Sequence, residues 1–425
     1  MTVTANAASL INDTEIEATL TQLVAPLARA AGIPDNRLKV HIVRDDDFNA
    51  FVMGGEDIYI YTGLLTRVKS PDALQAVVAH ELGHTLGGHM AQMSARMDAE
   101  MKRMMMIQAL GIGLMVAGGN PSLGAGVMAG STGVATQSML AFSRDEERIA
   151  DDMGVDLMVR AGQNPDGFIQ IFQQMGEMTQ AQESKINPNR VNHPLTAERL
   201  NNVRAKIDKI GTYTRPDAAT ARDRAAKYDL VRAKLIGYLD TPGRVRELYP
   251  TTDKSTAAIY ARAIASMQSG NLSAARTGAK TLTARMPDNP YFYELLGDIE
   301  YQSGDYDAGV AAYERSISLA GRAPQIETAL ALVLAERGGD GDATRAIELC
   351  KRAILSEPTP LAYWVLARAY GDDDGRADWA MAEFYNMRGD QKSAAKYARA
   401  AQKKLDRDAP EYIKSDDLLR HLKKS

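Results

Sequence analysis

Two histidines and a glutamate stand close together in the segment His80-Glu81-Leu82-Gly83-His84. Residues four positions apart share one face of an α-helix, so both imidazoles can bind one ion while Glu81 points toward the adjacent open position. A zinc ion held in this way keeps a water molecule, and a neighbouring carboxylate can accept its proton. The spacing therefore predicts a zinc site with His80 and His84 as ligands and Glu81 as the general base of peptide-bond hydrolysis.

A catalytic zinc needs a third protein ligand. Gly87 suits the extended motif of the metzincins, but Met90 occupies the position where that motif requires histidine. His89 lies five residues after His84, about 140° around a helix, so it faces away from the metal. We expect His89 to have a structural or supporting role.

The acidic run 143–151 (SRDEERIAD) offers a better third ligand. Glu147 and Asp151 are four residues apart, so on a helix Glu147 can bind zinc while Asp151 accepts a hydrogen bond from a ligating imidazole. Glu146 is the competing candidate ligand. A solvated, charged helix face is the alternative that involves no metal.

The elements that must position these residues can be predicted from local patterns. Apolar residues at helical spacing over 14–31 predict a helix, and alternation over 38–43 and 57–62 predicts two strands with Gly54-Gly55 as turn residues between them. Ser70-Pro71-Asp72 has the features of a helix start, with a capping serine and a proline at the first helical position. The histidine motif then lies on a long helix.

Composition narrows the possible functions. The chain has 425 residues, which favours two domains, and 50 basic against 54 acidic side chains give a net charge of -4 that provides no basis for nucleic-acid binding. The one cysteine, Cys350, excludes a thiolate cluster as the metal site. Residues 4–8 (TANAA) resemble the remnant of a secretory signal, which predicts export to the periplasm. The apolar segment 104–119 is too short to span a bilayer, which favours a buried helix or lid over a membrane-dipping segment.

The second half of the chain shows an internal repeat. Gly270, Gly304 and Gly338 recur every 34 residues, which is the period of tetratricopeptide (TPR) repeats, with an unrelated helical bundle as the alternative. Residues 211–217 lack periodicity and resemble a linker. We therefore predict a metallopeptidase domain over 8–209, a linker over 210–225 and a TPR-like helical repeat domain over 226–425.

Three motifs together resemble those of the HtpX-like and CAAX-prenyl-protease-like zinc metallopeptidases, which are gluzincins. They are HELGH at 80–84, SRDEERIAD at 143–151 and, before both, Asn49-Ala50-Phe51 with Gly54-Gly55 and 63–65 (GLL). The resemblance covers roughly residues 10–208, and the repeats match the soluble, TPR-bearing subgroup. It implies an α+β zincin-type metallopeptidase domain, mainly helical with a small sheet, followed by an all-α TPR solenoid.

The resemblance also implies roles for individual residues. Glu147 becomes the third zinc ligand and Asp151 its hydrogen-bonding support. The subgroup's H-P-x-T-x-x-R sequence is present from His193 to Arg199. His193 would either stabilise the oxyanion or bind zinc as a fourth ligand that keeps the enzyme latent, with Arg199 in a supporting role; a simple helix start at Pro194 is the alternative.

These observations predict a metalloendopeptidase with one Zn²⁺ per chain that cleaves unfolded or misassembled proteins in envelope quality control. The TPR domain would bind polypeptide substrates or a protein partner on its concave face. We expect a periplasmic protein with a peripheral contact to the membrane. Two alternatives stay open: a TPR chaperone or scaffold with a latent protease domain, and a purely structural zinc site with four protein ligands.

Overall fold

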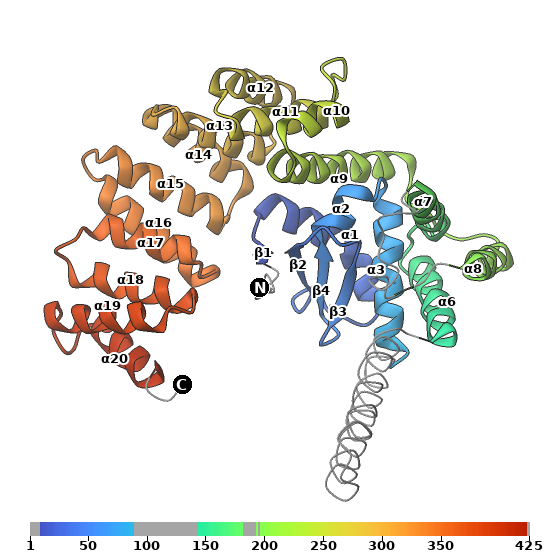
Figure 1. Ribbon diagram of the computed structural model, residues 1–425, viewed down its shortest axis with the longest axis horizontal. Helices are drawn as coiled ribbons and strands as arrows, with labels where there is room; N and C mark the ends of the chain where they lie inside the picture. Colours follow the sequence, from blue (N-terminus) through green and yellow to red (C-terminus); the bar gives the residue numbers. More distant parts are fainter. Residues whose placement is uncertain (1–8, 89–142, 182–192, 194–195, 423–425) are drawn as a thin grey trace, which may run out of the picture. The chain divides into compact units, whose positions relative to one another are not determined.

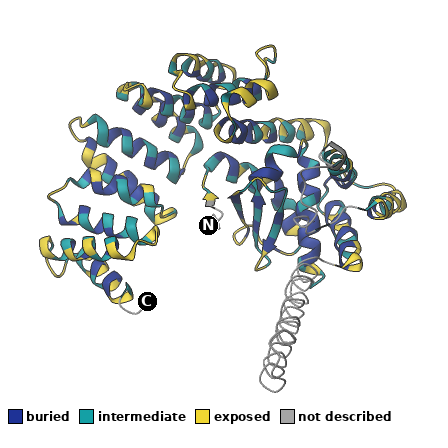
Figure 2. Cartoon of the chain, in the orientation of Figure 1, coloured by how far each residue is buried: buried dark blue, intermediate teal, exposed yellow. Residues whose placement is uncertain are grey.

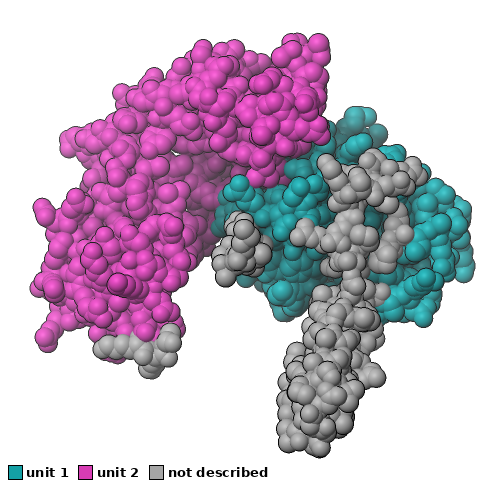
Figure 3. Space-filling model, in the orientation of Figure 1, with its two compact units in different colours: residues 1–12, 16–232 teal, residues 13–15, 233–425 magenta. Residues whose placement is uncertain are grey.

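The computed structural model describes residues 9–88, 143–181, 193 and 196–422, in which helices predominate and one small sheet lies near the N-terminus (Figure 1). The chain divides into two compact units (Figure 3). Unit 1 comprises Met1–Asn12 and Ile16–Arg232, and unit 2 comprises Asp13–Glu15 and Ala233–Ser425. The combination of a mainly helical domain with a small sheet and a helical repeat confirms the predicted fold class.

The sheet of unit 1 has four strands in the order β1-β2-β4-β3. Strands β2 and β4 are parallel, and the outer pairs β1–β2 and β3–β4 are antiparallel. The glycines predicted as turn residues connect β3 to β4, and Gly54 and Gly55 have φ angles of 62° and 82°, which side-chain-bearing residues rarely adopt. The strands are β1 (Ser9–Ile11), β2 (Lys39–Arg44), β3 (Ala50–Met53) and β4 (Asp57–Tyr61).

The long helix α3 of unit 1 packs against α6, α7 and β3. The helices are α1 (Thr14–Ala30), α2 (Thr62–Arg67), α3 (Pro71–Leu86), α6 (Arg144–Arg160), α7 (Gly167–Ala181), α8 (Ala197–Ile210) and α9 (Ala218–Leu239), the last of which continues into unit 2. Helix α3 starts as predicted, because the hydroxyl of Ser70 accepts a hydrogen bond from the N–H of Ala73 at 3.1 Å. It is buried on most of its surface, which makes it the central helix of the domain (Figure 2).

Close packing brings α6 against α3. A Cβ atom added at Gly83 would lie 2.5 Å from the carbonyl oxygen of Ala150, and one added at Gly154 would lie 2.6 Å from the ring of Phe168. Such distances are too short for any larger residue, so glycine permits these two contacts. The contact at Gly83 places the first turns of α6 beside the histidine motif.

Unit 2 is a succession of helical hairpins. Gly270, Gly304 and Gly338, predicted from their 34-residue spacing, follow the first helices of three hairpins, and their φ angles lie between 65° and 78°. The helices are α10 (Pro242–Leu248), α11 (Thr256–Gln268), α12 (Leu272–Arg285), α13 (Pro290–Gln302), α14 (Tyr306–Ala320), α15 (Pro324–Arg337), α16 (Asp342–Ser356), α17 (Pro360–Tyr370), α18 (Gly375–Met387), α19 (Gln391–Lys404) and α20 (Pro410–Leu422).

Small side chains fill the interior of this repeat array. Ala275, Ala279 and Ala346 are fully buried, and a Cβ atom at Gly278 would lie 2.8 Å from that of Ala263. Small residues let paired helices approach closely, which is the packing that a TPR period predicts.

The predicted linker and domain limits stay predictions. Residues 211–217 form neither helix nor strand, whereas residues 218–225 of the predicted linker belong to α9. Within the described residues no helix is long and apolar enough to cross a membrane. His89, the apolar segment 104–119 and the signal-like residues 4–8 lie outside the described residues.

Candidate metal centre and active site

Helix α3 presents the two histidines of the motif from one face. The Nε2 atoms of His80 and His84 are 3.1 Å apart, and both side chains are buried. The Nδ1 atom of His80 lies 2.9 Å from Oδ1 of Asp151, so the carboxylate accepts the Nδ1 proton and orients the ring with Nε2 toward His84. Both rings are therefore oriented for binding at Nε2.

Helix α6 brings Glu147, and not Glu146, to these rings. Glu146 is used in the helix cap, where its Oε2 atom accepts a hydrogen bond from the N–H of Ser143 at 2.8 Å. The next side chain points inward, with Glu147 Oε2 at 3.4 Å from Nε2 of His80 and Oε1 at 3.6 Å from Nε2 of His84. The capping box thus fixes which of the two adjacent glutamates faces the histidines.

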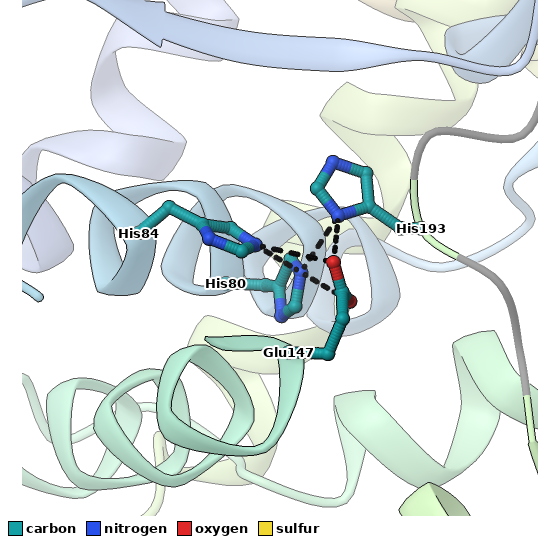
Figure 4. A group of neighbouring side chains, drawn as sticks. All are labelled: His80, His84, Glu147 and His193. Atoms are coloured by element: carbon teal, nitrogen blue, oxygen red, sulfur yellow. Dashed lines mark hydrogen bonds and ion pairs between the residues drawn. The ribbon is translucent and has the colours of Figure 1, made fainter. Parts of the chain in front are cut away.

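His193 joins the same cluster from the segment before α8 (Figure 4). Its Nδ1 atom lies 2.7 Å from Oε1 of Glu147 and 3.3 Å from Nε2 of His80, and its Nε2 atom lies 3.4 Å from Oε1 of Glu81. Figure 4 shows the three rings and the Glu147 carboxylate turned toward one another. His193 therefore faces both the candidate ligands and the candidate base.

The four side chains fit a zinc ion. One ligand atom from each of His80, His84, Glu147 and His193 lies within 4.8 Å of all the others. Zinc–ligand bonds of about 2.0–2.1 Å in a tetrahedron place neighbouring ligand atoms about 3.3 Å apart, and the separations of 3.1 to 3.6 Å among His80, His84 and Glu147 are close to this value. Three imidazoles and a carboxylate are also a donor set that zinc prefers.

Arg199 holds the two carboxylates of α6 in place. Its Nε and Nη2 atoms donate to the two oxygens of Asp151, each at 2.8 Å, and its Nη1 atom lies 2.6 Å from Oε2 of Glu147. The guanidinium also lies over the ring of Phe172, 5.3 Å from its centroid. This buried contact connects the first turn of α8 to the residues that face the histidines.

The pKa values in the cluster follow from burial and from these contacts. Burial raises the pKa of Glu81, because a carboxylate loses hydration there, and the charges of His193 and His80 only partly oppose it. Burial works against a charge on His80, but hydrogen bonds with Asp151 and Glu147 outweigh it and raise its pKa to about 9. A raised pKa makes Glu81 a better proton acceptor than an ordinary carboxylate.

Burial alone would also raise the pKa values of Glu147 and Asp151, but hydrogen bonds outweigh it and lower both values. Hydrogen bonds with His193 and His80 lower the pKa of Glu147 well below its ordinary value. Hydrogen bonds with Arg199 and His80 lower the pKa of Asp151. Both groups are therefore carboxylates, as binding a metal and orienting an imidazole require.

A pocket opens beside Glu81 and contains residues that the sequence did not reveal as functional. Its wall from α7 consists of Phe168, Ile171, Phe172 and Met175. Their spacing of three and four residues is that of any amphipathic helix packed on a core, so the pattern carries no signal of a site. Only the position of α7 against α3 makes them part of the site.

The class of this unit follows from its site: two imidazoles on one helix, a carboxylate from a second helix and a glutamate base define a metallopeptidase of the HExxH type. In agreement, residues 15–207 match the profile described as peptidase family M48, and residues 260–325 and 301–362 match that of the tetratricopeptide repeat. The chain carries an M48 peptidase domain followed by TPR repeats.

Several relatives match large parts of the chain. The chain is 23% identical over 339 residues to the beta-barrel assembly-enhancing protease of Yersinia pestis, covering 77% of this chain and 67% of the relative. It is 24% identical over 303 residues to the protein of the same name in Escherichia coli (strain K12), covering 69% of this chain and 60% of the relative. Over 41% of this chain it is 26% identical to metalloprotease LoiP of E. coli, of which 63% is covered. The chain thus spans about 60 to 67% of the length of these relatives.

Proposed function

We propose that this protein is a zinc metalloendopeptidase that cleaves unfolded or misassembled polypeptides. The observation that carries the proposal is the convergence of the His80, His84 and Glu147 ligand atoms next to Glu81, whose carboxylate is buried. A zinc ion bound there would polarise the scissile carbonyl and acidify a water molecule. Glu81 would accept the proton of that water, the resulting hydroxide would add to the scissile carbonyl carbon, and Glu81 would return the proton to the amine as the C–N bond breaks.

His193 can act in two ways in this proposal. With its Nδ1 atom 2.7 Å from Glu147, it occupies the position of a fourth ligand, which would leave no room for water and keep the enzyme latent. Turned away from Glu147, it could donate a hydrogen bond to the oxyanion of the substrate. Movement of His193 would then switch the enzyme from the first arrangement to the second.

The edge strand β3 provides the binding surface for substrate. Phe51 pairs with Tyr59, and the N–H of Tyr61 donates to the carbonyl of Asn49, so these odd-numbered residues direct their main chain toward β4. By alternation, the N–H and C=O groups of Ala50 and Val52 point to the other side of β3, where no strand of the described residues pairs with it. An extended peptide can pair there as an added strand, whatever its sequence.

The natural substrates and the location of the protein belong to the same proposal. The name of two relatives, beta-barrel assembly-enhancing protease, supports a periplasmic enzyme acting on misassembled outer-membrane proteins. The TPR unit would bind a partner or substrate and so raise the local concentration of polypeptide near the cleft.

Casein digestion tests the peptidase activity. We expect zinc-loaded protein to cleave casein, a chelator to abolish cleavage, and Glu81→Gln to reduce the rate about 10²- to 10⁴-fold without loss of zinc. The control is Glu177→Gln on α7, whose side chain is exposed. Zinc content measured by atomic absorption and digestion followed by electrophoresis give the two readouts.

A chaperone or scaffold with a latent protease domain is the second candidate, because His193 lies within the ligand set. His193→Ala distinguishes the candidates. If the enzyme is latent, this variant cleaves casein faster than wild type. If neither protein cleaves casein under any condition while zinc is bound, the scaffold or the structural zinc site is correct.

A further inference from the structure

Helix α19 of unit 2 differs in charge from the helices before it. It contains five basic residues and no acidic residue, whereas α14, which is likewise the second helix of its hairpin, contains two acidic residues and one basic residue. The whole chain has a net charge of -4, so the basic residues of α19 are a local concentration. The helix packs against α18 and α20 near the C-terminal end of unit 2 (Figure 1).

Four of these basic residues form a stripe along the outer side of α19. They follow one another at intervals of four, three and four residues, so they lie within an arc of about 60° and extend over about 16 Å of the helix. All four are exposed, while Ala394, Ala398 and Ala401 on the opposite side are buried. The α19 stripe consists of Lys392, Lys396, Arg399 and Lys403.

The charge of the α19 stripe is not cancelled by a neighbouring carboxylate. Of the five basic residues of α19, Lys404 alone forms an ion pair with a described residue, at 2.9 Å from Asp378. Asp390 accepts a main-chain hydrogen bond at the start of the helix, and Asp416 pairs with Arg420 of α20 at 2.5 Å. The stripe therefore presents four positive charges to a binding partner.

Aromatic rings lie beside the α19 stripe. Tyr397 stacks on Tyr385 of α18, with ring centroids 5.4 Å apart, and the ring of Tyr385 lies 5.0 Å from that of Phe384. Lys396 lies over the ring of Tyr397 at 5.5 Å, and Arg388 lies over that of Phe384 at 5.1 Å. The three rings are half-buried. Partly exposed rings next to cations are typical of protein surfaces at the boundary between water and lipid.

We infer that the α19 stripe is a docking surface for a membrane that contains anionic lipids. Each Lys or Arg close to an anionic lipid surface strengthens binding about fivefold. Because the stripe projects from the outer side of one helix, a surface of mobile head groups can reach all four cations at once. A folded acidic protein would need a matching concave surface to do so.

The helix would lie on the membrane and not enter it. Its apolar side is buried within unit 2, so only the cations and the half-buried rings are available to lipid. Docking of this kind is a property of unit 2 and does not require the proposed peptidase activity.

Vesicle co-sedimentation of the zinc-loaded full-length protein tests this docking. We compare vesicles of phosphatidylcholine alone with vesicles that also contain about 30% phosphatidylglycerol. We expect binding to the anionic vesicles only. Raising the salt concentration from about 0.1 M to about 0.5 M should abolish it, because salt screens the charges of an exposed surface.

A fourfold variant removes the charge of the α19 stripe. Replacing its four residues by Gln lowers the net charge by four and should weaken binding to anionic vesicles about 10²- to 10³-fold. The control lowers the net charge by the same amount at exposed basic residues that are scattered over the chain and should bind like wild type. It carries Arg204→Gln, Arg246→Gln, Lys280→Gln and Arg322→Gln.

Three outcomes would overturn the assignment. They are no binding of wild type to anionic vesicles, equal weakening in the stripe variant and the control, and tighter stripe-dependent binding to poly-glutamate than to anionic vesicles. The last outcome would show that the partner is an acidic polypeptide. Because the assay measures no cleavage, its result is separate from that of the casein digestion.

Discussion

The two units use their charged side chains in different ways. In unit 1, buried imidazoles, carboxylates and one guanidinium converge on a single point between α3 and α6. In unit 2 many ion pairs lie at the surface, such as Arg244–Glu247, whose side chains are 55% and 67% exposed. Alanines and glycines fill the space between its helices. The comparison shows that the geometry of the candidate site in unit 1 depends on a few buried polar contacts. The helical repeats of unit 2 depend instead on the same packing of small side chains in each hairpin.

Removal of the buried guanidinium of Arg199 should have the largest effect on the stability of unit 1. In Arg199→Ala, Asp151 and Glu147 would keep their charges in a buried site without the cation that pairs with them. We expect the free energy of unfolding to fall by about 3–5 kcal/mol and zinc affinity to fall as well. The measurements are urea denaturation and zinc titration.

The control for Arg199→Ala is Arg244→Ala in unit 2. The contact between Arg244 and Glu247 is nearly as short, at 2.9 Å, but exposed. We expect its loss to change stability by less than about 0.5 kcal/mol. Equal effects of the two substitutions would contradict the contrast between the units.

Two helical glycines test whether close packing or helix propensity determines stability. A methyl group at Gly83 would meet the carbonyl oxygen of Ala150, while one at Gly309 in α14 would have its nearest neighbour at an ordinary 3.5 Å. We expect Gly83→Ala to destabilise unit 1 by about 2–3 kcal/mol and to weaken zinc binding. Gly309→Ala should be neutral or stabilise unit 2 by up to about 1 kcal/mol. Thermal denaturation of both variants would show the opposite signs.

Glu294 of unit 2 is half-buried beside other charged side chains and differs in this from the surface ion pairs. Burial raises the pKa of Glu294 to about 8, since the repulsion from Asp13 and Asp298 adds to the loss of hydration and Lys234 only partly compensates. The folded carboxyl thus holds its proton more tightly than the unfolded one, whose pKa is near 4.5. As the pH rises from the unfolded to the folded value, the stability of unit 2 should therefore fall.

Glu294→Gln should remove this pH dependence. We expect the variant to be more stable than wild type by about 1–2 kcal/mol at about pH 9, and to be similar to it near about pH 4. Urea denaturation at a series of pH values measures the difference. The exposed Glu348 provides the control, and Glu348→Gln should show no such trend. A variant that is less stable than wild type at high pH would show that pairing with Lys234 outweighs burial.

The smallest expected effect compares two helix caps. Ser143 caps α6, which carries Glu147, and Thr359 caps α17 in unit 2, each by accepting one main-chain hydrogen bond. We expect Ser143→Ala and Thr359→Ala to destabilise the protein by about 1 kcal/mol each. Only Ser143→Ala should lower zinc affinity, because the cap decides that Glu147 faces the histidines. Equal zinc affinities would show that Arg199 alone positions Glu147.

Much of the fold could be predicted from the sequence, because local signals determine it. The capping serine at position 70 and the 34-residue glycine period each specify a local conformation and were found in the predicted place. Gly54-Gly55 form a turn as predicted, but the turn follows β3, a strand that the predicted alternation did not include, and β2 and β4 are parallel. The TPR repeats were predicted from the glycine period, and the peptidase family and fold class from the resemblance of the HELGH and SRDEERIAD motifs; these predictions are confirmed.

The candidate site could be predicted only where its residues belong to motifs. His80, His84, Glu147, Asp151, His193 and Arg199 lie together in the structure, while their chemical roles stay predictions. The choice between Glu146 and Glu147 depends on the cap of α6, and spacing alone left it open. The α7 wall of the pocket could not be predicted, because its residues acquire meaning only from the tertiary contact with α3.

The side of β3 that faces away from β4, where no described strand pairs, determines how a bound chain would move. Outward-facing main-chain groups recur at every second residue, so an unfolded polypeptide can slide by two residues and regain the same pairing. The bound polypeptide would move along β3 in steps of about 7 Å. Successive cleavage sites in one substrate would then lie an even number of residues apart. The fragments cut from a single substrate would therefore have mostly even numbers of residues, because successive residues of a strand alternate in direction.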